Sequence, residues 1–290
     1  MRLDPLHPAA WILDLLTADG WNVRDLLSFT RSSTLILAHR GVETPVVVKV
    51  GFGSNHVLHQ MAAEHRSAAY GFYWYIQLTD AERALSRDDF LHERDLARSA
   101  SHLAGVVPVV EHGELGDLPW YAMAWCDGGN FRPYLTHPKL QAQGLRVLGD
   151  IARGLDTLHQ AGIVHRDVYQ ENVLIHEGRG LLTDLGAARR IDSPRGPQHR
   201  APEPHWPPEY STDYAKATPA ADVFSLAVLI FRLVIGDLPR LGSRQDLAQL
   251  PRPLRDLVAN ALHHSPTMRP TASELASALY EAAAAAGRRS

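Results

Sequence analysis

Residues 165–175 read HRDVYQENVLI, and residues 181–188, a few positions further on, read LLTDLGAA. Asp167, Asn172 and Asp184 stand among apolar segments that are typical of short strands. The side chains of Asn172 and Asp184 offer hard oxygen ligands of the kind that Mg²⁺ prefers. Asp167 shares a loop with Asn172, so these three residues are candidates for binding a metal and for accepting a proton.

The same spacing resembles the eukaryotic-type protein kinase family, whose catalytic loop reads H-R-D-x-x-x-x-N and whose metal-binding turn reads D-F-G. The match extends from about Trp21 to the C-terminal helix, nearly the whole chain. The resemblance implies a bilobal fold of the α+β class, with a small antiparallel sheet and one main helix before a larger helical lobe. It also implies ATP and Mg²⁺ as cofactors, and transfer of the γ-phosphoryl group to a protein hydroxyl of the serine/threonine type.

The family's catalytic roles fall on matching residues of this chain. The resemblance implies that Asp167 orients the acceptor hydroxyl and takes its proton, with Arg166 beside it in the same triplet, while Asn172 and Asp184 hold the metal. Lys49 would contact the α and β phosphates, which suits a compact charge on a flexible stem. Taken alone, a lysine within the β-branched run VVVKV more often points to solvent.

That lysine requires a carboxylate to hold it. The stretch FLHERDLARSASHLAGVVPVV (residues 90–110) resembles the family's helix and the strand that follows, which makes Glu93 the expected partner. Glu82 and Glu64 are the alternatives.

Further family elements follow in order. Pro207-Pro208-Glu209 resembles the A-P-E triplet that closes the activation segment. Asp222 resembles the buried aspartate that supports the catalytic loop, and Arg269 resembles the arginine that pairs with the triplet's glutamate, here Glu209.

Residues 121–126, YAMAWC, resemble the strand and hinge that meet adenine. Met123 would be the gatekeeper, and the backbone groups of Ala124 and Cys126 would face the base. The alternative is an ordinary buried strand, but the following Gly128-Gly129 favours the hinge.

The phosphate loop departs from the family pattern G-x-G-x-x-G-x-V. Residues 28–35 read SFTRSSTL, so Ser28, Thr30 and Ser33 replace the three glycines and Leu35 takes the valine position. The small hydroxyl side chains can still bond to phosphate, but a glycine-type backbone conformation would cost on the order of 1 kcal/mol or more per site. We expect a weakened or altered grip on the nucleotide.

The substrate platform departs as well. Tyr169 stands where serine/threonine kinases usually place a lysine, and the position of that lysine's threonine partner falls near Pro202. These losses leave two alternatives open, namely a kinase of a small molecule or unusual acceptor, and a pseudokinase that serves as a scaffold for a partner. A protein kinase is favoured because four catalytic residues survive together: Lys49, Asp167, Asn172 and Asp184.

The activation segment is rich in proline. Residues 191–208 contain six prolines and a single hydroxyl residue, Ser193. Arg166 resembles the arginine that usually grips a phosphorylated activation loop, and Ser193 is the one phosphosite available to it here. Our hypothesis is that proline stiffness holds this loop ready without phosphorylation, since proline reduces the conformational freedom of the chain.

The order of elements predicts an N-terminal helical extension over residues 1–20, a small lobe over 21–126 and a large lobe over 127–290. The small lobe contains an insertion around 51–88, whose aromatic stretch 70–75 (YGFYWY) is either a packed helix or a docking surface for a partner. Strands are expected over 21–29, 34–39, 46–50, 106–111 and 120–125, and helices over 9–17, 140–160, 220–235, 254–263 and 272–285.

Composition fits an ordinary globular chain of 290 residues, with 45% hydrophobic and 21% charged residues. The formal net charge of −3 argues against a dedicated nucleic-acid binder. The single cysteine excludes an internal disulfide and fits a reducing compartment. The N-terminus does not resemble a secretory signal, and the apolar stretches are too short for a bilayer. We therefore expect a cytoplasmic protein without membrane contact, whose partners are a protein substrate or a regulatory protein.

Overall fold

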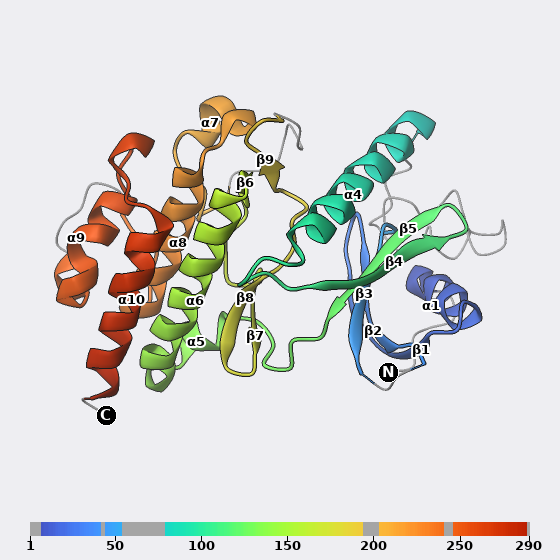
Figure 1. The fold of residues 1–290 in the computed structure, drawn as a ribbon, viewed down its shortest axis with the longest axis horizontal. Helices are drawn as coiled ribbons and strands as arrows, with labels where there is room; N and C mark the ends of the chain where they lie inside the picture. The colour runs from blue at the N-terminus through green and yellow to red at the C-terminus, as the bar shows by residue number, and fades with distance from the viewer. Residues whose placement is uncertain (1–6, 42–43, 54–78, 194–202, 241–245, 289–290) are drawn as a thin grey trace. The chain divides into compact units, whose positions relative to one another are not determined.

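The computed structural model describes residues 7–41, 44–53, 79–193, 203–240 and 246–288 (Figure 1). The chain forms two compact units. Unit 1 comprises residues 1–98 and 108–125, and unit 2 comprises residues 99–107 and 126–290. The lobe boundaries given by the sequence stay predictions.

Unit 1 is built on a five-stranded antiparallel sheet with the order β1-β2-β3-β5-β4. The strands are β1 (Asn22–Phe29), β2 (Thr34–His39), β3 (Val46–Val50), β4 (Val109–Leu115) and β5 (Leu118–Ala124). The run of β-branched residues in β3 suits a central strand that is covered on both faces. The predicted strands 34–39 and 46–50 are confirmed to the residue. β4 begins later than predicted because the N–H of Val107 donates to the carbonyl of Leu182 in unit 2, 2.9 Å away.

A helix packs on each face of this sheet. Alternate residues of a strand point to opposite faces. Val48 and Val50 join the buried cluster that includes Ile12 and Leu16 of α1 (Pro8–Ala18). The other face, which carries Lys49, meets α4 (Asp80–Ala100). The predicted helix 9–17 is therefore present, and it belongs to the core of unit 1.

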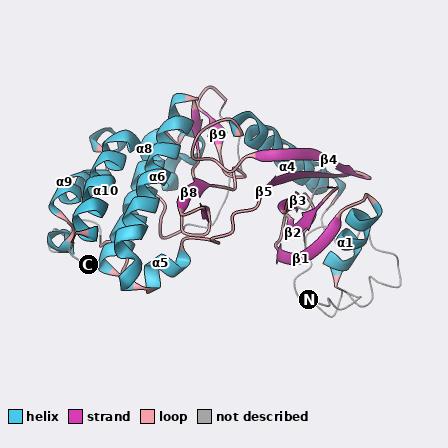
Figure 2. Cartoon of the chain, turned by 60° about the horizontal axis from the view of Figure 1, so that its bottom comes forward, coloured by secondary structure: helices cyan, strands magenta, loops and turns pink. Residues whose placement is uncertain are grey.

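Unit 2 is mainly helical, as the cyan ribbons of Figure 2 show, so the predicted fold class is confirmed. Its helices are α5 (Arg132–Thr136), α6 (Gln141–Gln160), α7 (Tyr210–Asp213), α8 (Pro219–Ile235), α9 (Arg252–Ala261) and α10 (Ala272–Gly287). Four of them match the long helices that the sequence predicted. Short 3-10 turns cover Pro138–Leu140, Tyr214–Lys216, Asp246–Gln249 and Pro266–Met268.

Helix α6 lies in the centre of unit 2 and packs against α8 and α10. Its buried face includes Asp150, whose carboxylate accepts a hydrogen bond of 2.7 Å from the Tyr280 hydroxyl of α10. A capping box between Thr271 and Glu274 fixes where α10 begins. Among the described residues, no helix is both long and apolar enough to cross a bilayer.

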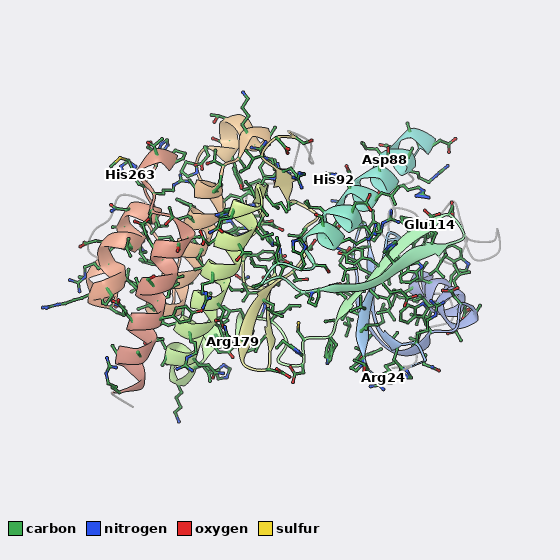
Figure 3. All side chains as sticks on the ribbon, viewed as in Figure 1. Arg24, Asp88, His92, Glu114, Arg179 and His263 are labelled. Atoms are coloured by element: carbon green, nitrogen blue, oxygen red, sulfur yellow. The ribbon has the colours of Figure 1, made fainter. Side chains whose placement is uncertain are left out.

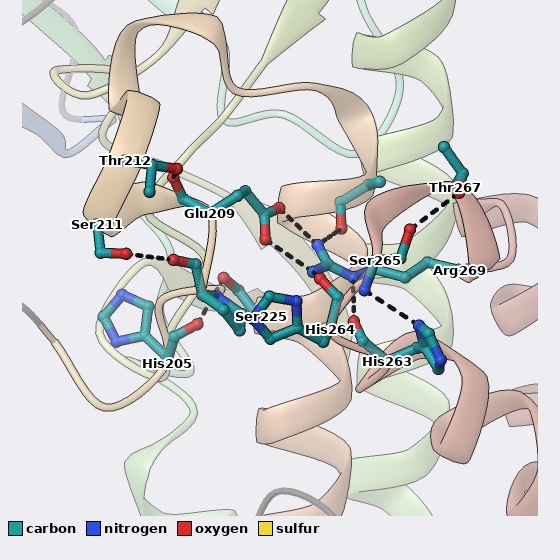
Figure 4. A network of polar contacts seen from close by, with 12 residues as sticks. His205, Glu209, Ser211, Thr212, Ser225, His263, His264, Ser265, Thr267 and Arg269 are labelled. Carbon is teal, nitrogen blue, oxygen red and sulfur yellow. Dashed lines mark hydrogen bonds and ion pairs between the residues drawn. The ribbon is translucent and has the colours of Figure 1, made fainter.

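The segment before α8 is held by the ion pair between Glu209 and Arg269 (Figure 4). The Arg269 guanidinium donates to both carboxylate oxygens, at 2.6 and 2.7 Å, and lies over the Phe224 ring. Such bidentate geometry is stronger than a single contact and fixes orientation as well as distance. The pairing predicted from the sequence is confirmed.

Candidate active site

Lys49 and Glu93 form a buried ion pair in unit 1. The Lys49 Nζ lies 2.5 Å from Glu93 Oε1, and both side chains are less than a tenth exposed. The hydroxyl of Tyr121 donates to the same carboxylate oxygen at 2.6 Å. Lys49 and Tyr121 are register partners on β3 and β5, so both side chains leave the same face of the sheet. The predicted contact is present, and Tyr121 is a third member that sequence reasoning missed.

Glu82 and Glu64 were the alternative partners expected for Lys49. Glu82 forms a capping box with Thr79 at the start of α4, with hydrogen bonds of 2.7 and 3.3 Å. These bonds from Thr79 lower the pKa of Glu82, which caps the helix and does not contact the lysine. Glu64 lies outside the described residues.

Helix α4 is also tied to the neighbouring strands. Arg87 donates to Glu114 of β4 at 2.9 Å, and the Phe90 ring packs on Tyr121. Figure 3 labels Glu114 on β4, and Asp88 and His92 on the helix. These contacts fix the rotation of α4, so that Glu93 is directed at the sheet.

The phosphate-loop residues form a tight turn between β1 and β2. The Thr30 N–H and hydroxyl both donate to the Ser33 carbonyl, at 2.9 and 3.0 Å, and the Ser33 N–H donates back to the Thr30 hydroxyl at 3.2 Å. Ser33 is buried, and Ser28 pairs with Leu35 across the strands. The Thr30 hydroxyl, which stands where the family has a glycine, therefore stabilises the turn itself.

The expected backbone strain in this turn is absent. Among the described residues other than glycine, positive φ occurs at Arg166, Glu177 and Asp184, and none of these is in the phosphate loop. The close approach occurs instead at Gly53, just after β3. A Cβ there would lie 2.5 Å from the Thr30 carbonyl oxygen, so the loop backbone fits only against glycine.

The expected hinge residues end the sheet. Met123 is buried and pairs with Val47 and Val109, as a gatekeeper in a central strand would. The Ala124 N–H donates to the Pro108 carbonyl at 3.0 Å, so this N–H already has a partner within unit 1. Burial, with the nearby charge of Asp127, raises the pKa of the Cys126 thiol to about 11, so it stays protonated at neutral pH. Their contacts with adenine remain predictions.

In unit 2, the catalytic loop is held by Asp222 of α8. This fully buried carboxylate accepts the backbone N–H groups of His165 and Arg166 at 2.8 and 2.7 Å. It also meets the Nε2 atom of His159 at 2.8 Å. Burial alone would raise the pKa of Asp222, but the hydrogen bond and charge of His159, with the contributions of His165, lower it below the ordinary value. The supporting role that the sequence predicted is confirmed.

Arg166 belongs to this loop; its side chain is buried, and its backbone has a φ of 66°. Its guanidinium donates to the carbonyls of Ala187 and Tyr214, at 2.5 and 3.2 Å, and lies 4.4 Å from the centre of the Tyr214 ring. Burial lowers the pKa of this guanidinium from its ordinary value, although arginine stays protonated in proteins. Backbone carbonyls and an aromatic face thus engage Nε and Nη1 of the arginine expected to grip a phosphate, while its buried Nη2 has no hydrogen-bond partner among the described residues.

The hairpin of β7 (Val173–His176) and β8 (Arg179–Leu182) brings the expected metal ligands together. Glu177 and Gly178 have φ values of 50° and 74°, the positive pair that a two-residue hairpin turn requires. Val173 pairs with Leu182, and beyond them the Thr183 N–H donates to the Asn172 carbonyl at 3.1 Å. Asn172 and Asp184 therefore leave the open end of one hairpin.

These two side chains are of the chemical type that holds a magnesium ion. The Asn172 Nδ2 donates to the carbonyl and the carboxylate of Asp167, at 2.9 and 3.2 Å, so its Oδ1 is left for a cation. One Asp184 oxygen accepts the Gly186 N–H at 3.2 Å. The described residues contain no group of three or more acidic, histidine or cysteine side chains that could hold a metal alone. Two protein oxygens completed by phosphates and water are the usual magnesium pattern.

His205 is a residue of the site that the sequence reasoning missed. Its Nε2 lies 3.2 Å from Asp167 Oδ1, and its ring stacks on Tyr169 with centroids 4.9 Å apart. Pro202, where the threonine of the family platform was expected, lies outside the described residues. His205 does not belong to any family motif. Its contact with Asp167 joins positions 38 residues apart, so local sequence patterns do not indicate it. The tyrosine in place of lysine, and the proline at the expected threonine position, signalled that this region differs without pointing to His205.

A strand-rich unit with a buried lysine–glutamate pair and a helical unit with an HRD loop above a buried aspartate define a kinase-like protein. The family described as "Protein kinase domain" matches residues 47–280, and the chain belongs to this family.

Several curated relatives carry the name serine/threonine-protein kinase. PkaB of Streptomyces coelicolor is 34% identical over 271 residues, which cover 79% of this chain and 63% of that protein. PknJ of Mycobacterium tuberculosis is 31% identical over 217 residues, covering 66% and 33%. PkwA of Thermomonospora curvata, named a probable kinase, is 31% identical over 184 residues, covering 58% and 25%. The chain thus spans less than two thirds of the length of each of these relatives.

Replacing Asp222 by asparagine is expected to destabilise the protein by roughly 2–4 kcal/mol at pH 7, because hydrogen bonds to a charged acceptor are lost. The lowered pKa of Asp222 stabilises the fold above the pKa of the unfolded chain, near 4, and this contribution is lost as the pH falls through the lower folded-state pKa. The difference between wild type and Asp222→Asn should therefore shrink below about pH 4. Denaturant unfolding at several pH values measures it, with the exposed Asp256→Asn as control. A difference that stays constant down to pH 3 would contradict this assignment.

Gly53→Ala is expected to destabilise unit 1 by about 1–3 kcal/mol, because the new methyl group collides with the Thr30 and Arg31 carbonyls. Gly287→Ala is the matched control, since a Cβ at the end of α10 meets nothing within 4 Å. Chemical denaturation of both variants gives the comparison. Equal stability of the two variants would show that the turn yields easily at Gly53.

Proposed function

We propose that this chain is an ATP- and Mg²⁺-dependent protein kinase that transfers the γ-phosphoryl group to a serine or threonine hydroxyl of a protein. The observation that carries the proposal is the convergence of Asp167, Asn172 and Asp184 on one hairpin and its adjoining loop. Membership of the protein kinase family supports it. Since the chain spans only part of its relatives, its substrate and partners belong to the proposal.

The proposed reaction follows from the roles of these groups. The acceptor oxygen forms a bond to the γ-phosphorus, while the bond from that phosphorus to the bridging oxygen breaks and ADP leaves. Asp167 takes the proton of the acceptor hydroxyl. When bound, Mg²⁺ would neutralise charge on the phosphate oxygens, with Asn172 Oδ1 and the Asp184 carboxylate as its protein ligands. The reaction requires that Lys49 act on the same nucleotide.

The state of Lys49 supports its proposed role. A buried ammonium group is costly unless it is paired, and Glu93 supplies the opposite charge at 2.5 Å. The Tyr121 hydroxyl occupies a further lone pair of that carboxylate oxygen, which holds the glutamate in place. The lysine is thus positioned before any nucleotide arrives, as an electrostatic role in phosphoryl transfer demands.

The first test is transfer of labelled γ-phosphate from ATP with Mg²⁺, with the chain itself and a generic protein as acceptors. We expect label on a protein in the wild type, and a loss on the order of 10²-fold or more in Asp184→Asn, the scale for removing one preorganised electrostatic group. The exposed Asp237→Asn should label like wild type.

The other outcomes select among the alternatives. ATP binding without transfer, measured by calorimetry, would favour a small-molecule acceptor or a scaffold over a protein kinase. Absence of ATP binding would mean that the turn at Thr30 and Ser33 does not accept phosphates, and it would leave a scaffold. Equal labelling in wild type and Asp184→Asn would remove Asp184 from the metal site.

We further propose that activity does not require phosphorylation of the activation segment. Carbonyls of Ala187 and Tyr214 already accept from Arg166, the residue that a phosphate would engage. Ser193 is the only hydroxyl residue between positions 191 and 208.

The expected result is that Ser193→Ala transfers phosphate within about twofold of wild type, because prolines restrict this segment without a modification. Initial rates of γ-phosphate transfer, with mass spectrometry of Ser193 in the wild type, provide the measurement. Loss of all activity in Ser193→Ala, together with phosphate on Ser193 in active wild type, would overturn the hypothesis.

A further inference from the structure

We propose that His205 is a positioning residue for Asp167 and takes over part of the role of the lysine that Tyr169 replaces. The inference rests on the proposed function, since it concerns the carboxylate that would take the acceptor's proton. It goes beyond the family pattern, because neither His205 nor Tyr169 matches a motif residue of the family.

The carboxylate of Asp167 is held at both oxygens. His205 Nε2 lies 3.2 Å from Oδ1, and Asn172 Nδ2 lies 3.2 Å from Oδ2. Two donors on different oxygens fix the rotation of the carboxylate plane. An ionised carboxylate oxygen has two lone pairs, so accepting one hydrogen bond does not in itself prevent it from accepting another. This is the arrangement that a carboxylate needs when it must orient a hydroxyl and then take its proton.

The imidazole is itself held from several sides. Its ring lies parallel to Tyr169, with an angle of 5° between the planes. The His205 carbonyl accepts a hydrogen bond of 2.8 Å from the buried Ser225 of α8, shown in Figure 4. His205 is only 9% exposed. A ring with so little freedom can place its N–H without losing much entropy during the reaction.

The loss of the lysine and the presence of this histidine are therefore connected. A lysine two residues after Asp167 would place an ammonium group near that carboxylate, but Tyr169 has a ring in its place. The ring cannot carry the positive charge, yet it gives the imidazole a flat surface on which to stack. For Nε2 to donate to Asp167, it must carry the ring proton. A purely structural role would need only the stacked ring and would not depend on this N–H.

Three variants separate a positioning role of the His205 N–H from a purely structural role of its ring. His205→Phe keeps an aromatic ring on Tyr169 and removes the donor. His205→Gln keeps a donor at a similar reach and removes the ring. The double variant His205→Phe with Tyr169→Lys restores the family's lysine. Phenylalanine at the exposed His102 is the control for the substitution itself.

We expect His205→Phe to lower kcat of phosphate transfer by about 10–100-fold, the range found for losing a supporting hydrogen bond, with the KM for ATP within twofold of wild type. His205→Gln should keep most of the activity, and the double variant should regain about tenfold over His205→Phe. Melting temperatures should be alike for wild type, His205→Phe and His102→Phe. The proposal would be overturned if the kcat of His205→Phe equalled that of an active wild type. It would also be overturned if the rate depended on the aromatic ring, which His205→Phe keeps, and not on the hydrogen-bond donor, which His205→Gln keeps.

A second measurement needs no turnover, so it separates this proposal from the proposed function. The ¹⁵N chemical shifts of the His205 ring should show the proton on Nε2 in wild type, and they should change in Asp167→Asn. A neutral ring with its proton on Nδ1 alone would overturn the assignment, even if the chain transfers phosphate. The expected shifts in a chain that transfers none would support the contact, while the proposed function would fail.

Discussion

The candidate catalytic loop of this protein depends on one buried carboxylate. Asp222 reaches the backbone of His165 and Arg166 from α8, and without it two N–H groups in the interior would lack an acceptor. The same loop places Arg166 at a φ of 66°, a conformation that costs on the order of 1–3 kcal/mol for a residue with a side chain. The two hydrogen bonds offset that cost. Because Asp167 follows directly, its position relative to α8 is set by the backbone.

Unit 1 also stabilises a buried charge, but there the partners are side chains and not backbone N–H groups. Lys49 lies on a buried strand face, and its charge is tolerated because Glu93 pairs with it and Tyr121 donates to the same carboxylate oxygen. Both units thus place an ionised group in a low-dielectric setting and surround it with fixed donors or acceptors. Such groups need little rearrangement when charge shifts nearby, which is the requirement of electrostatic catalysis.

Much of the fold and of the candidate site was predictable, because the sequence patterns that indicate them are local or belong to a family motif. Strand 46–50 and the long helices follow from hydrophobic periodicity, and Asp222, Glu209 and Arg269 follow from their motifs. Tyr121 and His205 escaped prediction because each bond joins residues far apart in sequence and depends on side-chain rotation. The two-residue strands β6 (Ile163–Val164) and β9 (Arg189–Arg190) are too short to show a period. The aromatic stretch 70–75 lies outside the described residues, so its two interpretations stay open.

The turn closed by Thr30 and Ser33 has a thermodynamic consequence for any ligand that it meets. A glycine-rich loop is ordered by its ligand and loses backbone entropy at that moment, roughly 0.5–1 kcal/mol more per glycine than another residue would. Here the hydroxyl–carbonyl bonds and the contact with Gly53 order the turn during folding. Ligand binding then resembles the filling of a preformed site, with a smaller entropic penalty and less adaptation to ligands of different shape.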